Sequence, residues 1–236
     1  MSAELRAMAL ARGERRSSLW LYRFVRGTVR AVVHPLLRVQ ARNTAILDRP
    51  GPTILAPVHR SHLDSVLVAC QSRRRIRALG KESLFTTPGV SYVCAALGAI
   101  PVRRGEADRD ALQAAKALLG RGESMIVFPE GGRRYGNEIG PLFDGAAWLA
   151  SRTGAPVVPI GIAGTEAVLP MGAKRPHRSR VAIVVGDPMT PPRPPDGQGR
   201  VTRQAISQFT AELGAELACL QAEAVDMAAR RTRVAR

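Results

Sequence analysis

The chain contains 236 residues, 45% hydrophobic and 23% charged, which is typical of a globular protein and excludes a disordered, collagen-like or disulfide-dense chain. The 35 Lys and Arg against 19 Asp and Glu give a net charge of +16, which indicates a polyanionic partner: nucleic acid, an anionic membrane surface or a phosphorylated substrate. An aromatic content of only 4% disfavours a protein that stacks single-stranded bases. Nearly all of the basic residues are arginines, so a compositional bias of the source genome is an alternative origin of the charge.

Residues 1–49 form a basic segment with ten arginines against three acidic residues, and a helix is predicted between Leu19 and Val39. One side of this helix is apolar and carries Leu21, Phe24, Val25, Val32 and Leu36. The opposite side carries Arg23, Arg26 and Arg30. Pro35 is expected to kink the helix or end it near His34. The pattern fits a membrane-interface anchor whose arginines contact lipid phosphates, or a helix packed on the core with a solvated arginine face.

Residues 50–190 follow a Pro-Gly-Pro turn and predict an α/β domain with a mostly parallel central sheet flanked by helices. The expected strands are Thr53–Val58, Ile76–Leu79, Ile100–Val102, Ser124–Phe128, Val157–Ala163 and Val181–Val185. The expected helices are Leu63–Gln71, Asp108–Leu119 and Gly145–Thr153. Residues 191–236 are predicted to begin with most of an exposed Pro-rich linker, Pro188–Gln198. A helix from Val201 to Ala229 is expected to follow and to pack on the domain, with a basic tail after it.

Cysteine use and hydropathy indicate the cellular compartment. The three cysteines, Cys70, Cys94 and Cys219, are too few and too widely spaced for a disulfide framework or a zinc site, which favours a reducing, cytoplasmic environment. No secretory signal is evident, and the longest uncharged stretch, Ser83–Val102, is interrupted by Pro and Gly. We therefore expect a chain that is soluble or bound at a membrane surface.

Polar residues directly follow the first predicted strand, where α/β proteins place their sites. His59 and Asp64 are five residues apart, a spacing that lets the carboxylate accept the Nδ1 proton of the imidazole and leaves Nε2 as a base. Ser61 lies in the same turn and is expected to cap the following helix rather than to act as a nucleophile. His62 completes an H-x-x-H-x-D string, but no further ligand cluster supports a metal site.

A second polar segment, Pro129-Glu130-Gly131-Gly132-Arg133-Arg134, follows the predicted strand Ser124–Phe128. Flexible glycine backbone beside a guanidinium suits a phosphate group. Neither a Walker motif nor a dinucleotide-binding glycine motif occurs at a predicted strand-to-helix turn. Arg103 and Arg104 add cations at a third strand end. If these strands are parallel, the segments meet at one rim of the sheet.

These motifs resemble the glycerolipid acyltransferases of the 1-acylglycerol-3-phosphate (lysophosphatidic acid) acyltransferase type, from about Pro57 to Gly161. The first segment resembles the family's H-x4-D motif, and Gly98–Arg104 resembles a second block ending in an acceptor-binding arginine. The segment from Phe128 to Arg133 is similar to its F-P-E-G-T-R block. Two shorter segments also match, Val158-Pro159-Ile160 and the stretch Gly80–Phe85 with its lysine. The chain departs from the usual pattern at Val58, Pro101, Gly132 and Arg134, which leaves the acceptor open.

The resemblance implies transfer of a fatty acyl group from acyl-CoA or acyl carrier protein to the free hydroxyl of 1-acylglycerol 3-phosphate in phospholipid synthesis. His59 would be the general base and Asp64 would orient it. Lys81, Arg104 and Arg133 would bind the phosphate, with a structural or binding role for Glu130 and Gly131. No metal or cofactor is implied.

The implied partners are a lysophospholipid acceptor, the acyl donor and an anionic membrane surface. The implied location is peripheral or monotopic, at the cytoplasmic face of the cell membrane. The apolar stretch Pro88–Leu97 is a candidate wall of the acyl groove. Two alternatives remain: the same chemistry on glycerol 3-phosphate, another lysolipid or a glycolipid, and a non-catalytic basic protein that binds nucleic acid. The second leaves both motifs around His59 and Glu130 unexplained, so no nucleic acid partner is expected.

Overall fold

A seven-stranded sheet forms the centre of the computed structural model, which describes residues 2–103, 108–173, 175–194 and 199–230. The strand order is β1-β7-β6-β2-β5-β3-β4, and neighbours are parallel except β6 and β7, which are antiparallel. The strands are β1 Gln40–Arg42, β2 Thr53–Pro57, β3 Ile76–Lys81, β4 Ala99–Val102, β5 Ser124–Ile126, β6 Val157–Ala163 and β7 Ala182–Val185. The predicted α/β class with a mostly parallel sheet is confirmed.

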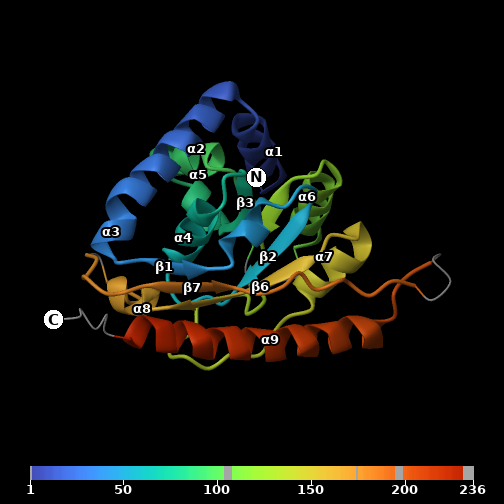
Figure 1. The fold of residues 1–236 in the computed structure, drawn as a ribbon. Coiled ribbons are helices and arrows are strands. Elements are labelled where there is room, and N and C mark those ends of the chain that lie inside the picture. The colour runs from blue at the N-terminus through green and yellow to red at the C-terminus, as the bar shows by residue number, and fades with distance from the viewer. Residues whose placement is uncertain (1, 104–107, 174, 195–198, 231–236) are drawn as a thin grey trace.

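Helices cover both faces of this sheet (Figure 1). The helices are α1 Ser2–Gly13, α2 Arg16–Thr28, α3 His34–Leu36, α4 Asp64–Gln71, α5 Pro88–Ala96, α6 Arg109–Gly120, α7 Gly145–Thr153, α8 Thr165–Val168 and α9 Arg203–Ala229. A π-helical turn, Val29–Val33, joins α2 to α3, and two 3₁₀ turns span Thr44–Asp48 and Glu82–Phe85. The face with α4 and α5 also carries α1 and α2, whereas α7 and the long α9 pack on the other face (Figure 1). Within the described ranges, no helix combines the length and hydropathy needed to cross a bilayer.

The predicted strands occur within one or two residues of their expected bounds, but β1, α1, α5 and the short α8 were not predicted. Strand β1 has only three residues, all exposed, and it exists because backbone groups such as the Gln40 N–H bond to the β7 segment. Helix α5 was missed because its sequence begins with Pro88 and Gly89, although proline is well tolerated in the first turn of a helix. Helix α1, with its weakly segregated apolar residues, was also missed.

The segment Pro188–Gln198 differs from the predicted exposed linker. Met189 forms an antiparallel bridge with Val157, and Pro191 is buried, so the beginning of the segment is tied to the sheet. Residues 195–198 and the basic tail at 231–236 lie outside the described residues. The C-terminal helix packs against β6 and β7, as expected from its apolar positions, and among its buried residues are Phe209, Leu213 and Leu217.

The N-terminal rod, Arg16–Leu36, consists of α2, the π-helical turn and α3, and it ends one residue after Pro35, near His34 as expected. A π turn has a wider hydrogen-bond spacing than an α turn, which relieves the clash between a proline ring and the preceding turn. Arg26 donates to the carbonyls of Ser72 and Arg73, just beyond the C-terminus of α4, and Arg30 donates to Cys70. Carbonyls at a helix C-terminus lack partners within the helix and attract cations.

The outer face of the N-terminal rod therefore carries large apolar side chains, with Arg23 exposed beside Trp20. Trp20 and Phe24 are 70% and 71% exposed, and Val32 and Leu36 are also exposed. The opposite side holds the rod on the domain through Tyr22, whose buried hydroxyl accepts the backbone N–H of Ile76 and whose pKa is raised by that burial. Of the three arginines expected to meet lipid phosphates or solvent, Arg26 and Arg30 donate to backbone carbonyls of the domain, whereas Arg23 is exposed.

An ion pair ties α1 to the domain. Arg6 donates to both oxygens of Asp108 at 3.1 and 3.0 Å, and Asp108 caps α6 by accepting the backbone N–H of Ala111. The same carboxylate accepts the N–H of Arg103 at 2.9 Å. Burial alone would raise the pKa of Asp108, but the two backbone hydrogen bonds and the Arg6 charge outweigh it, so the pKa is lowered.

Lowering the pH should weaken the ion pair between Arg6 and Asp108. Because the folded pKa of Asp108 is below its unfolded value of about 3.9, the carboxylate stabilises the fold above that value and loses this contribution as the pH falls through the folded pKa. We expect Asp108→Asn to lower the free energy of unfolding most at neutral pH and progressively less below about pH 4. Urea unfolding across pH would measure this. The control is Asp110→Asn, because Asp110 is exposed. If Asp108→Asn lowered the free energy of unfolding equally at every pH, the lowered pKa of Asp108 would be contradicted.

The close approach of α9 to the sheet requires glycine at position 161. A Cβ built there would lie 2.3 Å from the carbonyl oxygen of Leu220 in α9. The Cβ would collide with backbone, so the two elements would have to separate. We expect Gly161→Ala to lower the free energy of unfolding by about 1–3 kcal/mol, as overpacking does.

Gly145, at the start of α7, has nothing within 4 Å of a built Cβ and provides the matched control. Urea unfolding should show little loss for Gly145→Ala, since alanine is the better helix former. Equal stability of the Gly161→Ala variant and the unchanged chain would show that α9 does not pack this tightly on β6.

Candidate functional site

The candidate site lies at the rim of the sheet where the parallel strands end. Strands β2, β5, β3 and β4 run in the same direction, so the segments that follow them emerge at one rim. The segment with His59 follows β2, and the segment with Glu130 follows β5. Lys81 ends β3 and Arg103 follows β4. The prediction that these segments share one rim is confirmed.

His59 and Asp64 are joined directly at this rim. The Nδ1 atom of His59 lies 3.0 Å from Oδ2 of Asp64, and both side chains are buried. The same Oδ2 accepts the backbone N–H groups of Arg60 at 2.6 Å and Ser61 at 2.7 Å. These bonds hold the carboxylate at the beginning of α4. With Nδ1 donating to Asp64, Nε2 is the nitrogen that can accept a proton.

The imidazole is also fixed by stacking. The ring of Phe128 lies 3.8 Å from that of His59, centroid to centroid, with an interplanar angle of 18°. Phe128 belongs to the segment after β5, so the two rim segments contact each other through these rings. A ring held by one hydrogen bond and one stacked face keeps a fixed direction for Nε2.

Glu130 occupies the centre of the site but does not face an open space. Its side chain is 1% exposed, and Oε2 accepts the backbone N–H of His59 at 2.9 Å. Arg60 donates to both carboxylate oxygens, at 3.0 and 2.8 Å, and Gly140 donates its N–H to Oε1 at 3.1 Å. Arg60 also donates to the carbonyl of Glu138 at 2.8 Å. Of the roles expected for Glu130, this arrangement corresponds to the structural one.

The backbone conformation at Gly131 favours glycine. Its φ is +66°, a value that side chains disfavour, and a Cβ there would lie 2.8 Å from the ring of Phe143. The adjacent Arg134 donates its backbone N–H to the carbonyl of His59 at 2.8 Å. The segment after β5 is therefore folded back tightly onto the segment after β2.

The cations expected to bind phosphate are placed unequally. Arg133 is half-buried and Lys81 is exposed, and neither makes a hydrogen bond or ion pair with another described residue. Both guanidinium and ammonium groups are therefore available to an anion at the rim. Arg104 lies outside the described residues, and its neighbour Arg103 is partly exposed beside Asp108.

An apolar pocket of about 360 Å³ lies beside the first rim segment, between α2, α4, β3 and α5. Its lining is mostly aliphatic and includes Tyr22, Val25, Val66, Ala69, Leu79, Leu84, Cys94 and Leu97. His62 and Ser65 line it as well, so the pocket approaches the start of α4. Burial raises the pKa of Cys70, another lining residue, to about 11, which keeps its thiol neutral. The predicted apolar wall at Pro88–Leu97 contributes Cys94 and Leu97.

Some residues of the site were not predicted from the sequence, and others were predicted to have a different role. Arg60 was not singled out, although an arginine beside the histidine and a glutamate after the next strand could have suggested a buried pair. Ser61 does not cap α4: its hydroxyl donates to the carbonyl of Leu169 at 3.1 Å, and the residue that precedes the helix is Leu63. Phe128 was assigned to a strand rather than to the site.

The chain matches known proteins over the same region. Residues 38–163 match the family model described as Acyltransferase. The chloroplastic 1-acyl-sn-glycerol-3-phosphate acyltransferase BAT2 of Brassica napus is 30% identical over 125 residues, which are 52% of this chain and 36% of that protein. The corresponding enzyme of Chlamydomonas reinhardtii, CHLREDRAFT_174358, is 28% identical over 159 residues, 66% of this chain and 48% of its own. The chain thus spans about half or less of the length of these curated relatives.

A solved structure shows the same fold. The crystal structure of the 1-acyl-sn-glycerophosphate (LPA) acyltransferase PlsC from Thermotoga maritima superimposes with a TM-score of 0.69 at 20% identity, covering 96% of this chain and 90% of that one. At this identity the likeness concerns the fold. The family model, in contrast, covers more than half of the chain and includes both rim segments, with His59, Asp64 and Glu130. The chain therefore belongs to the Acyltransferase family.

Proposed function

We propose that this protein transfers a fatty acyl group from acyl-CoA or acyl carrier protein to the free hydroxyl of 1-acylglycerol 3-phosphate. The observation that carries the proposal is the buried His59–Asp64 pair at a rim that also presents the unpaired cations Lys81 and Arg133. A base and a phosphate-binding charge at one place match an acceptor that carries both a hydroxyl and a phosphate. The names of the curated relatives support the same acceptor.

In the proposed reaction, Nε2 of His59 removes the proton of the acceptor hydroxyl as its oxygen attacks the thioester carbonyl. Asp64 stabilises the imidazolium that forms, because it accepts the Nδ1 proton in a buried position. The tetrahedral intermediate then collapses, the carbon–sulfur bond breaks, and the imidazolium returns the proton to the thiolate. The products are the ester and a free thiol, so the reaction needs no metal or redox cofactor.

The phosphate of the acceptor would be held by Arg133 and Lys81, with Arg104 as a further candidate. Binding energy from this remote group orients the hydroxyl toward the thioester. The apolar pocket beside α4 would accept the acyl chain, since its walls are aliphatic and it begins near His62.

We further propose peripheral association with the cytoplasmic face of the cell membrane through the apolar face of the N-terminal rod. Trp20 and Phe24 expose large apolar side chains that a bilayer interface would cover. A lysolipid acceptor resides in such a bilayer, so this association would bring the rim to its substrate. The arginines of the rod play a smaller part in this proposal than the sequence implied, because Arg26 binds the domain.

The assignment of the base can be tested with single substitutions. His59→Ala and Asp64→Asn should each lower kcat by about 10²- to 10⁴-fold, the usual contribution of general base catalysis. The assay is transfer from labelled oleoyl-CoA or oleoyl-acyl carrier protein to 1-acylglycerol 3-phosphate, glycerol 3-phosphate and other lysolipids. The exposed His177 supplies the control variant, His177→Ala, which should keep full activity. Undiminished turnover by folded His59→Ala would exclude His59 as the base.

Arg60 is expected to act as a positioning residue through its ion pair with Glu130. Arg60→Lys keeps the charge but loses the paired hydrogen bonds to the carboxylate, so the His59 backbone should shift. We expect kcat to fall by about 10- to 100-fold with little change in KM, since small displacements of a catalytic group have such effects.

The matched control is Arg134→Lys, because Arg134 contacts the same segment through its backbone and its side chain is exposed. The pH dependence of kcat should change for Arg60→Lys, whereas a purely structural role would lower only the amount of folded enzyme. A folded Arg60→Lys variant with unchanged kcat and pH profile would contradict the positioning role.

A further inference from the structure

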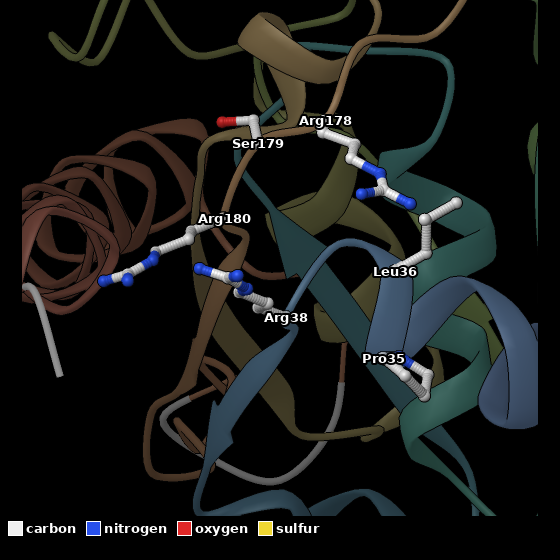
Figure 2. A pocket seen from close by; sticks show the side chains of 6 residues that line it. All are labelled: Pro35, Leu36, Arg38, Arg178, Ser179 and Arg180. Atoms are coloured by element: carbon white, nitrogen blue, oxygen red, sulfur yellow. The ribbon is translucent and has the colours of Figure 1, made fainter. Parts of the chain in front are cut away.

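A basic cavity lies apart from the residues assigned to catalysis. It has a volume of about 360 Å³ and is lined by Pro35, Leu36, Arg38, Arg178, Ser179 and Arg180. Three of these six residues are arginines and none is acidic. Leu36 ends the N-terminal rod and Arg38 follows it, whereas Arg178 and Arg180 belong to the segment leading into β7. In Figure 2 the side chain of Arg178 extends toward Leu36, and that of Arg180 extends toward α9. We call these three arginines the three-arginine site.

The three-arginine site lies on the same rim of the sheet as His59. Strand β7 is antiparallel to β6, with Ala182 opposite Ala163, so the beginning of β7 lies where β6 ends. Strand β1 is parallel to β7, with Gln40 opposite Ala182, so Arg38 precedes β1 at that rim as well. The site therefore occupies the β1 edge of the rim, and Arg103 follows β4 at the opposite edge.

The backbone at Arg38 is unfavourable for an arginine. The N–H of Val39 donates to His34 and that of Arg38 donates to Pro35, the paired bonds of a Schellman motif at the end of α3. Arg38 takes the left-handed position of this motif, with φ of +45°, where glycine is preferred. A strained residue of this kind indicates that its side chain has a role, and this side chain lines the cavity.

The segment with Arg178 and Arg180 is connected to the catalytic segment. Ser61, between His59 and Asp64, donates its hydroxyl to the carbonyl of Leu169, and the N–H of His177 donates to Val168. Residues 170–180 contain four Lys and Arg and no acidic residue. The repulsion among these charges is unfavourable unless an anion offsets it.

We propose that the three-arginine site binds the phosphate group of an anionic phospholipid at the bilayer surface. Guanidinium groups bind phosphate through paired hydrogen bonds. The side chains of Arg38 and Arg178 make no hydrogen bond or ion pair with another described residue, whereas Arg180 donates to the carbonyl of Arg230 and adds its charge from the side. A lipid rather than a soluble phosphate is favoured because Leu36, which lines the cavity, is 46% exposed, and Val32, one turn earlier in the rod, is 58% exposed. Apolar side chains beside a phosphate site match the boundary between acyl chains and headgroups.

This inference rests on the proposed association with membranes and adds an orientation to it. The exposed apolar residues of the rod extend from Trp20 to Leu36, a distance of roughly 24 Å along a helix, and the three-arginine site lies at its end. Attachment at both places would fix how the rim faces the bilayer, which one apolar patch alone would not do.

The test is co-sedimentation of the full chain with vesicles of phosphatidylcholine, with and without phosphatidylglycerol. The site variant is Arg38→Gln/Arg178→Gln/Arg180→Gln. The control variant loses the same charge at exposed arginines near the start of α9, Arg193→Gln/Arg200→Gln/Arg203→Gln. We expect the site variant to bind anionic vesicles roughly 100-fold more weakly, at about fivefold for each of the three arginines, and the control variant to change far less.

Two results would overturn the inference: equal losses in both variants, which would show diffuse electrostatic attraction, or no loss in the site variant. Unchanged vesicle binding combined with a higher KM for acyl-CoA in detergent would assign the site to a soluble phosphate instead. The variant Trp20→Ser/Phe24→Ser distinguishes failure of the three-arginine site from failure of the proposed membrane association. If that variant loses vesicle binding while the site variant does not, only the three-arginine site is refuted; if the unchanged chain binds no vesicles, the membrane proposal fails as well.

Discussion

The carboxylate of Glu130 is the group on which the arrangement of the rim depends. It is almost completely buried, and a buried charge is tolerated only when it is paired and hydrogen-bonded. The partners that satisfy it come from separate segments: the guanidinium of Arg60 and the backbone of His59 follow β2, whereas Gly140 lies ten residues beyond the glutamate. One side chain thereby fixes the backbone of the histidine, and the stacked ring of Phe128 fixes its imidazole. Asp64 completes the arrangement from the first turn of α4.

The N-terminal rod shows how packing decides the meaning of an amphipathic helix. Its two faces are clear in the sequence, but which face meets the domain depends on what the domain offers. The end of α4 presents carbonyls that need donors, and Arg26 and Arg30 provide them. The large apolar residues Trp20 and Phe24 are left outside, where they would otherwise contact water. For the proposed action on lipids, large exposed apolar side chains would serve attachment to a bilayer.

Cations gather at two places along the same rim. Lys81 ends β3 and Arg133 follows β5, while Arg38, Arg178 and Arg180 lie toward the β1 edge. The Ser61 hydroxyl bonds to the Leu169 carbonyl and the His177 N–H bonds to Val168, so the segment leading to Arg178 is held against the segment with His59. These five of the 35 basic residues thus lie along one rim of the sheet, which is the side on which the proposed acceptor would be held.

The amino-acid sequence by itself determined the α/β class, the bounds of the buried strands and the His59–Asp64 pair, because these depend on local apolar runs and on residues five positions apart. It also placed the segments around His59 and Glu130 after strands, and parallel pairing then brought them together. Only the tertiary structure decided the Arg60–Glu130 ion pair, strand β1 and the outward direction of Trp20. Each depends on a partner distant in sequence: Arg60 and Glu130 are 70 residues apart, and β1 exists through β7. Local pattern contains no information about such partners, since the energy that selects them arises when the segments are packed together.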